Sequence, residues 1–227
     1  MLALKLGLSL PTTRPMGKWS PDDETSLEAW YENARGISLD GSAVSQWADS
    51  SGNSVDMEQA NPARQPAYDV VTGVLTFVSA DKEYLQSAGQ VSLSGEFTIG
   101  VKMFPDSTAT GTFLGDNTTS NEKFKIAASN KLSITIGGTL KNFSLDSGDW
   151  GDTYIVITRD GADLISLWYN GQLQADTETL TGTSLIDAIS VRATNVDNFD
   201  GTISEIQIYS SSSAGLTANV NDRLSTL

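Results

Sequence analysis

The sequence predicts an all-β protein: a two-sheet antiparallel jelly-roll sandwich with an extended N-terminal arm and a short C-terminal helix. Three observations support this prediction. About a dozen short segments alternate apolar and polar side chains, which is the period of a half-buried strand. Turn-forming residues separate these segments at hairpin spacing, and the 227 residues include 20 Gly. The sequence lacks the alternation of strands and helices that builds a parallel sheet.

The first predicted elements are two short apolar segments that each carry a tryptophan. We expect strands at residues 27–31 and 44–48, anchored in one core by Trp30 and Trp47. Two further strands, at residues 74–79 and 83–87, flank the turn Ala80-Asp81-Lys82.

The clearest alternation lies in residues 96–104. Phe97, Ile99, Val101 and Met103 fall on one face, the predicted core face, and the residues between them face outward. More strands are expected at residues 111–115, 122–128, 131–136, 140–145, 152–159, 164–169, 172–176, 186–193 and 202–209, and a helix at residues 216–224. The large side chains expected in the core are Trp30, Trp47, Phe77, Phe97, Trp168 and Tyr209.

Two stretches also resemble a known family. The order "AWY", a Gly/Asp turn, "VSQWADSSGN" and a "TF" strand resembles the opening of laminin-G-like (concanavalin A-like) jelly-roll domains. Residues 199–224 resemble their closing segment, with a Gly turn, a strand and a short helix. The resemblance implies a jelly-roll domain at residues 27–227, preceded by an arm and linker at residues 1–26. It does not define a function, because lectins, glycosidases, adhesion modules and virion proteins share this architecture.

The N-terminal segment has leucine at every second position. In an extended strand this period places all five side chains on one face, and such a face must be covered by the home sandwich or by a partner chain. We predict an assembly interface, in which the arm adds to a neighbour's sheet. A signal peptide is the alternative, although Lys5 interrupts the apolar run and no basic region precedes it. The predicted interface residues are Leu2, Leu4, Leu6, Leu8 and Leu10.

Composition excludes several classes of function. The chain has 28 acidic and 14 basic residues, a net charge of −14, and no basic cluster, so nucleic acid is not an expected partner. It has no apolar run long enough to span a bilayer, so no membrane role is expected. Cysteine and histidine are absent, which removes disulfides, thiol chemistry and the usual catalytic triads.

No catalytic pair is evident in the sequence. Glycosidases place two carboxylates across the sugar, and jelly-roll glucanases take theirs from a Glu-x-Asp-x-Glu type pattern on one strand. The acids near predicted strands are single instead: Glu83, Glu96, Glu122 and Glu205. We therefore expect no enzyme activity and no cofactor.

One acidic loop is a candidate binding site. Asp146, Asp149 and Asp152 recur at intervals of three in a Gly-containing segment, with Trp150 among them. Clustered carboxylates suit calcium, and an exposed indole could stack on a sugar. The alternative for Trp150 is a packing role, and the loop matches no calcium-loop signature.

Three hypotheses for the function remain. The first is a virion structural protein of a tailed bacteriophage, a capsid decoration, head-fibre or tail component. It would join other virion proteins or its own copies through the arm and display a domain toward cell-surface glycans. The alternative is a secreted or cell-surface carbohydrate-binding or adhesion module, which would require export. A glycosidase is the third and least supported hypothesis.

Overall fold

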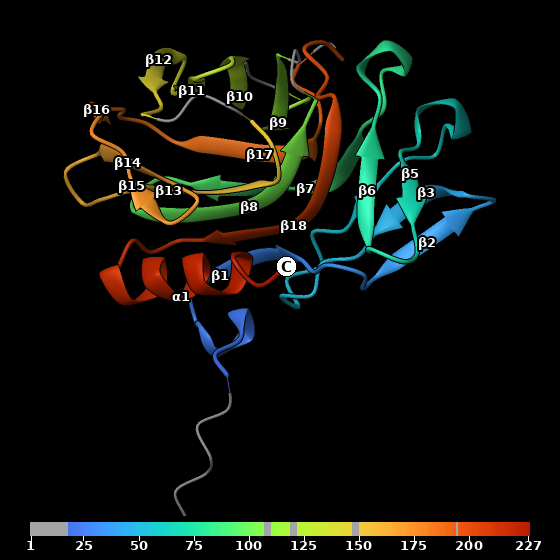
Figure 1. Cartoon of the computed structure of the whole chain (residues 1–227), viewed down its shortest axis with the longest axis horizontal. Helices are drawn as coiled ribbons and strands as arrows, with labels where there is room; N and C mark the ends of the chain where they lie inside the picture. Colours follow the sequence, from blue (N-terminus) through green and yellow to red (C-terminus); the bar gives the residue numbers. More distant parts are fainter. Residues whose placement is uncertain (1–17, 107–109, 119–121, 147–149, 194) are drawn as a thin grey trace, which may run out of the picture.

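The computed structural model describes residues 18–106, 110–118, 122–146, 150–193 and 195–227. It confirms the predicted fold, a sandwich of two antiparallel layers with one short C-terminal α-helix (Figure 1). The predicted arm residues, Leu2 to Leu10, lie outside the described residues, and so do four internal segments.

The first layer is centred on β18 and β8. β18 (Gly201–Tyr209) pairs along its length with β8 (Phe97–Pro105), and β8 pairs on its other side with β13 (Thr153–Arg159). β14 (Leu164–Tyr169) extends the layer beyond β13. Shorter strands complete the two sides of this layer: β1 (Leu27–Tyr31), β6 (Val74–Phe77), β15 (Gln172–Leu173) and β16 (Glu178–Thr179).

The second layer packs against the first and is antiparallel throughout. Its strands follow one another in the order β7 (Leu85–Leu93), β17 (Ser184–Ile189), β9 (Gly111–Gly115), β10 (Lys123–Ala128), β11 (Lys131–Ile136) and β12 (Thr139–Ser144).

Four short strands connect the two layers at one end of the molecule (Figure 1). β3 pairs with β4, which reaches β7 of the second layer, and with β5, which reaches β6 of the first. The bounds are β2 (Ile37–Asp40), β3 (Ala43–Trp47), β4 (Met57–Glu58) and β5 (Ala67–Asp69). Single 3₁₀ turns lie at Pro21–Asp23, Pro62–Arg64 and Ser79–Asp81.

The core between the layers contains half of the large side chains that the sequence places there: Trp47, Phe77 and Phe97 are buried in it, as predicted. Trp30 and Tyr209 are also buried, but in a second apolar cluster on the outer face of the first layer, so Trp30 and Trp47 do not anchor one core. Phe97 meets Phe124 edge to face at 6.3 Å between ring centres, a favourable aromatic geometry. Trp168 also lies outside the core between the layers, and it is only partly buried.

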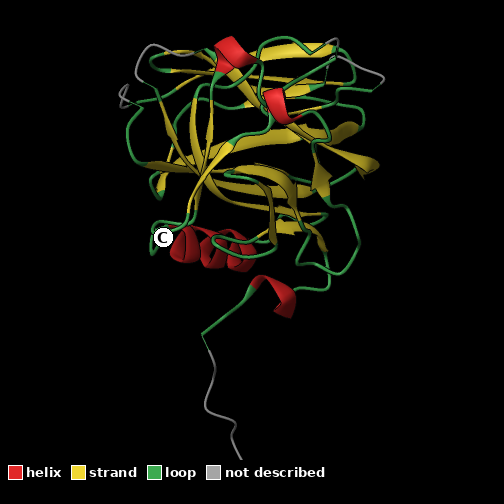
Figure 2. Ribbon diagram, turned by 90° about the vertical axis from the view of Figure 1, so that its right-hand side faces the viewer, coloured by secondary structure: helices red, strands yellow, loops and turns green. Residues whose placement is uncertain are grey.

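Helix α1 (Ala214–Leu224) covers the outer face of the first layer (Figure 2). Its side chains Leu216, Val220 and Leu224 recur every fourth residue and pack against a second apolar cluster that includes Trp30 and Val156. The side-chain oxygen of Ser213 accepts a hydrogen bond from the Leu216 backbone N–H and caps the helix. The described part of the chain contains no helix of the length and apolarity that a membrane span requires.

The helix also changes the environment of the outward-facing residues of β8. The sequence predicts that Thr98 and Lys102 face away from the core, and they do, yet Thr98 is 0 % and Lys102 is 8 % exposed. Thr98 donates a hydrogen bond to the Ser211 carbonyl just before the helix. The outer face of the first layer is thus buried under the helix, and this buried area ends near β14.

Candidate functional site

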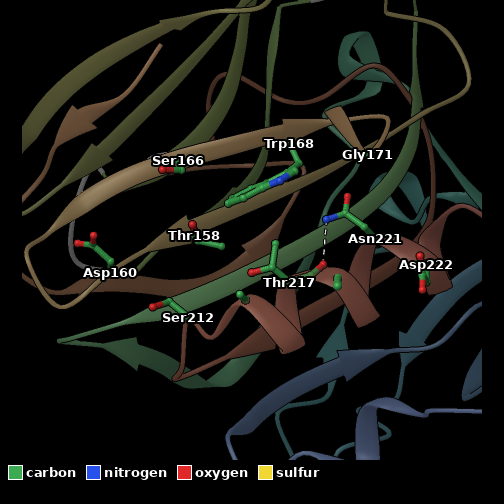
Figure 3. Close-up of a pocket in the computed structure, with 11 residues that line it drawn as sticks. Thr158, Asp160, Ser166, Trp168, Gly171, Ser212, Thr217, Asn221 and Asp222 are labelled. Atoms are coloured by element: carbon green, nitrogen blue, oxygen red, sulfur yellow. Dashed lines mark hydrogen bonds between the residues drawn. The ribbon is translucent and has the colours of Figure 1, made fainter. Parts of the chain in front are cut away.

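A groove separates helix α1 from the outer face of β13 and β14. Its volume is about 580 Å³, and all the residues that line it belong to the described part of the chain. The sheet contributes Thr158, Ser166 and Trp168, and the helix contributes Thr217 and Asn221 (Figure 3). Two other hollows on the described surface are smaller, at about 140 and 370 Å³. The groove beside α1 combines an indole with hydroxyl and amide groups.

Trp168 occupies the sheet wall of the groove because of strand alternation. Ile165, Leu167 and Tyr169 of β14 point into the core and are buried, so Ser166 and Trp168 point the other way. Trp168 pairs across the strands with Val156. The sequence-based placement of Trp168 in the core is therefore wrong: one side of the indole packs on the apolar cluster under α1, and the rest borders the groove.

The helix wall carries a short relay of hydrogen bonds. Thr217 Oγ1 donates to the Ser213 carbonyl at 3.1 Å, and Asn221 Nδ2 donates to the Thr217 carbonyl at 2.8 Å. Asn221 Oδ1 is buried and has no hydrogen-bond partner among the described residues. An unsatisfied buried acceptor costs about 1–3 kcal/mol, so a donor that reached it would be favoured.

Two exposed carboxylates belong to the groove lining. Asp160 follows β13, and its Oδ1 accepts hydrogen bonds from the backbone N–H groups of Ala162 and Leu164 at 2.8 and 2.9 Å. These bonds hold the turn between β13 and β14. Asp222 lies in the last turns of α1. Among the described residues that line the groove, there is no lysine or arginine.

The acidic loop predicted from the sequence lies elsewhere. Asp146 is exposed, and its backbone N–H donates to Gln174 Oε1 at 2.8 Å. Asp152 forms an ion pair with Lys102 at 2.7 Å. Asp149 lies outside the described residues, so the predicted calcium site stays a prediction. Within the described residues, no three Asp, Glu, His or Cys side chains form a group that could hold a metal.

Trp150 does not present a surface to a sugar in this structure. Its side chain is 8 % exposed, its indole N–H donates to the Ala128 carbonyl at 2.9 Å, and its ring meets Tyr169 edge to face at 5.6 Å. These contacts are those of a packing role, which is the alternative prediction for Trp150. Trp168, which is only partly buried, lines the groove instead.

A buried carboxylate at the rim of the second layer is structural. Asp187 accepts hydrogen bonds from the Thr118 hydroxyl, from the Asn117 backbone N–H at 2.7 Å and from Gln86 Nε2 at 3.3 Å. Burial raises its pKa, and the charge of nearby Asp116 adds to this effect. The bonds around Asp187 connect the loop after β9 to β17 and β7.

Comparisons with known proteins show which solved structures are similar to this fold. No protein-family model matches the sequence, and no curated protein matches it either. The binding domain of Paraclostridial Mosquitocidal Protein 1 is similar in structure, with a TM-score of 0.55 and 12 % identity over 91 % of this chain and 52 % of that one.

Binding domains of Botulinum neurotoxin DC are similar to the same degree. The one in complex with rat synaptotagmin II has a TM-score of 0.51, and the one in complex with SialylT has a TM-score of 0.50. Each is 17 % identical over 90 % of this chain and 52 % of the toxin chain. The chain thus spans about half the length of these domains and shares their β-sandwich fold.

Proposed function

We propose that this chain is a non-enzymatic carbohydrate-binding module and that the sugar lies in the groove beside Trp168. The observation that carries the proposal is the outward-facing indole on β14, which forms one wall of a 580 Å³ groove. A flat aromatic ring packs well on the apolar face of a pyranose. Convergent hydroxyl, amide and carboxylate groups then fix its orientation.

The polar groups of the groove suit this partner. Ser166 can donate to or accept from sugar hydroxyls, the Thr217 hydroxyl can accept, and the second amide hydrogen of Asn221 can be donated. No histidine or lysine that could activate a hydroxyl lines the groove within the described chain. The structurally similar toxin domains are binding domains, and one of them is in complex with SialylT, which supports a binding role. We accordingly expect no hydrolysis of a bound glycan.

The decisive variant is Trp168→Ala in the full chain. Removing the indole should weaken glycan binding at least about tenfold, because stacking and apolar contact are lost together. Phe104→Ala is the matched control, since Phe104 is a 50 % exposed aromatic residue that does not line the groove. Binding is measured on a glycan array and then by titration calorimetry with the best glycan.

A second variant separates loss of the site from loss of the fold. Ala218 lies exposed on the groove side of α1, so Ala218→Gln narrows the groove without touching the core. We expect weaker binding with an unchanged unfolding midpoint in urea. Full glycan affinity in both the Trp168 and Ala218 variants would rule out this site.

The virion role and location predicted from the leucine arm concern Leu2 to Leu10, which lie outside the described residues, and they stay a prediction. A glycan-binding domain is compatible with display on a virion and with the alternative of a secreted or cell-surface module. The two proposals about location differ in whether the arm is retained and whether it assembles with other chains.

A further inference from the structure

The charged side chains that line the groove beside Trp168 within the described chain are all negative. Asp160 lies near one end of the groove and Asp222 near the other (Figure 3). Both residues are exposed, and no positively charged side chain lines the groove within the described chain. The net charge of the whole chain is −14, which makes the electrostatic potential at the groove more negative.

Three cations on neighbouring elements are engaged by other partners. Arg223 follows Asp222 in sequence, but its guanidinium group bonds to buried Glu205. Lys102 forms an ion pair with Asp152 at 2.7 Å, and Lys18 donates to Thr226 Oγ1 at 3.4 Å. None of these three lines the groove, so none offers a ready partner to an anionic ligand.

Carboxylates treat neutral and anionic sugars in opposite ways. A hydroxyl donates a charge-assisted hydrogen bond to a carboxylate, which is stronger than a bond between neutral groups. A sialic acid brings its own carboxylate, which two aspartates repel and which would lose water without gaining a cation. Selectivity of this kind comes from the unfavourable contact with the wrong ligand as much as from the favourable one.

Resting on the proposed function, we infer that this groove selects neutral saccharides and rejects their sialylated or sulfated forms. Asp160 and Asp222 are the specificity-determining residues, and Trp168 supplies contact area to either class. This assignment comes from the groove's own charges, and it differs from what the similar toxin domain in complex with SialylT would suggest.

The test compares neutral glycans with their sialylated counterparts on one array, using the full chain. We expect the neutral member of a pair to bind at least about tenfold more tightly at low salt, since each carboxylate contributes a factor of about five at close range in water. Higher salt should narrow the difference, because exposed charges are screened.

Charge-removing variants assign the effect to residues. Asp160→Asn keeps an amide oxygen for the two turn hydrogen bonds, and Asp222→Asn keeps the shape of the helix surface. In the double variant, the preference for neutral over sialylated glycans should fall by at least about fivefold. The control is Asp40→Asn with Asp81→Asn, which changes net charge equally at two exposed sites that do not line the groove.

The outcomes separate this inference from the proposed function. If sialylated glycans bind as tightly as neutral ones, and Trp168→Ala still abolishes binding, the groove binds sugar but the inferred specificity is wrong. If the control pair relaxes discrimination as much as the groove pair does, net charge accounts for it and the two assigned residues are wrong. If no array glycan binds in a Trp168-dependent manner, the proposed function fails, and the inference fails with it.

Discussion

The guanidinium group of Arg223 lies over the ring of Trp30, 4.8 Å from its centroid, and bonds with two nitrogens to the carboxylate of Glu205. Glu205 is 0 % exposed and also accepts from the Trp30 indole N–H at 3.2 Å and from Gln207 Nε2 at 2.7 Å. Trp30, Glu205 and Arg223 come from β1, β18 and α1. Their contacts fix the end of the helix to the sheet and thereby set the position of the helix wall of the groove.

Removing Arg223 should therefore destabilise the fold strongly. Arg223→Met keeps most of the side-chain volume over Trp30 but leaves Glu205 as a buried charge without its cation. Breaking one partner of a buried pair costs about 3–5 kcal/mol. The free energy of unfolding, measured in urea, gives the cost directly.

The double variant Arg223→Met with Glu205→Gln is the control for that interpretation. It removes the buried charge as well, so part of the lost stability should return. If the double variant is as unstable as the sum of the two single ones, the pair is not coupled and Arg223 acts by packing alone.

Trp47→Ala tests the predicted anchor of the core. The indole is 0 % exposed, packs 5.7 Å from the Tyr31 ring centre and donates to the Glu32 carbonyl at 3.2 Å. Truncation should cost about 3–5 kcal/mol of unfolding free energy, as large-to-small changes of buried aromatics do. A cost below about 1 kcal/mol would show that the site collapses without penalty and that Trp47 is no anchor.

Asp197 makes the stability of one rim depend on pH. Burial tends to raise its pKa, but hydrogen bonds and charge from Arg192, at 2.7 Å, and Lys125, at 3.1 Å, outweigh it and hold the pKa below the ordinary 3.8. A carboxyl whose pKa is lower in the folded state stabilises the fold above its unfolded pKa. This contribution is lost as pH falls through the folded-state pKa.

Asp197→Asn should therefore lower the free energy of unfolding near neutral pH and leave it almost unchanged at acid pH. We expect about 1 kcal/mol at about pH 7, since these are partly exposed ion pairs, and little difference at about pH 2. Asparagine tolerates the left-handed backbone at this position, where φ is 58°. Urea midpoints at the two pH values measure the effect, and an equal loss at both would contradict it.

The leucine arm makes a separate prediction about assembly. Deleting residues 1–15 should leave a folded, monomeric sandwich that no longer joins its oligomer or particle, because five leucines are worth about 1.5–3 kcal/mol each when buried. Leu6→Asp should act similarly, whereas Lys5→Ser, on the opposite face, should matter much less. Sedimentation velocity measures assembly. An unfolded truncated chain would assign the arm to the home core.

Most strands could be predicted because apolar and polar residues alternate along them. Alternation in residues 96–104 and 131–136, and turn residues between them, place β8 and β11 within a residue of their observed bounds. β2, β4, β5 and β16 were not predicted. β2 carries mostly exposed side chains and the other three have two or three residues each, so none shows a period.

The groove could be predicted only in part. The order Ile165, Leu167, Tyr169 places Trp168 on the outer face of β14, so alternation alone argues against a core position. The opposite wall comes from a helix about fifty residues later in the chain, and its position depends on tertiary packing that no local pattern records. The acidic residues around Trp150 predicted a binding loop, but hydrophobic burial determines the position of that indole.

Gly100 determines how closely that helix can approach the sheet. A Cβ atom at this position of β8 would lie 2.5 Å from Val220 Cγ1 and 3.1 Å from Leu224 Cδ1. Gly100→Val should therefore push α1 outward, at a cost of about 1–3 kcal/mol for overpacking, and weaken the glycan binding that we propose, because Thr217 and Asn221 move with the helix. Gly215→Ala is the matched control, since a Cβ at this exposed helical position meets nothing and should stabilise the helix by about 0.5–1 kcal/mol. Urea unfolding measures both changes, and hydrogen exchange of the α1 amides reports the displacement. Unchanged exchange and binding in the Gly100 variant would show that the helix position does not depend on this contact.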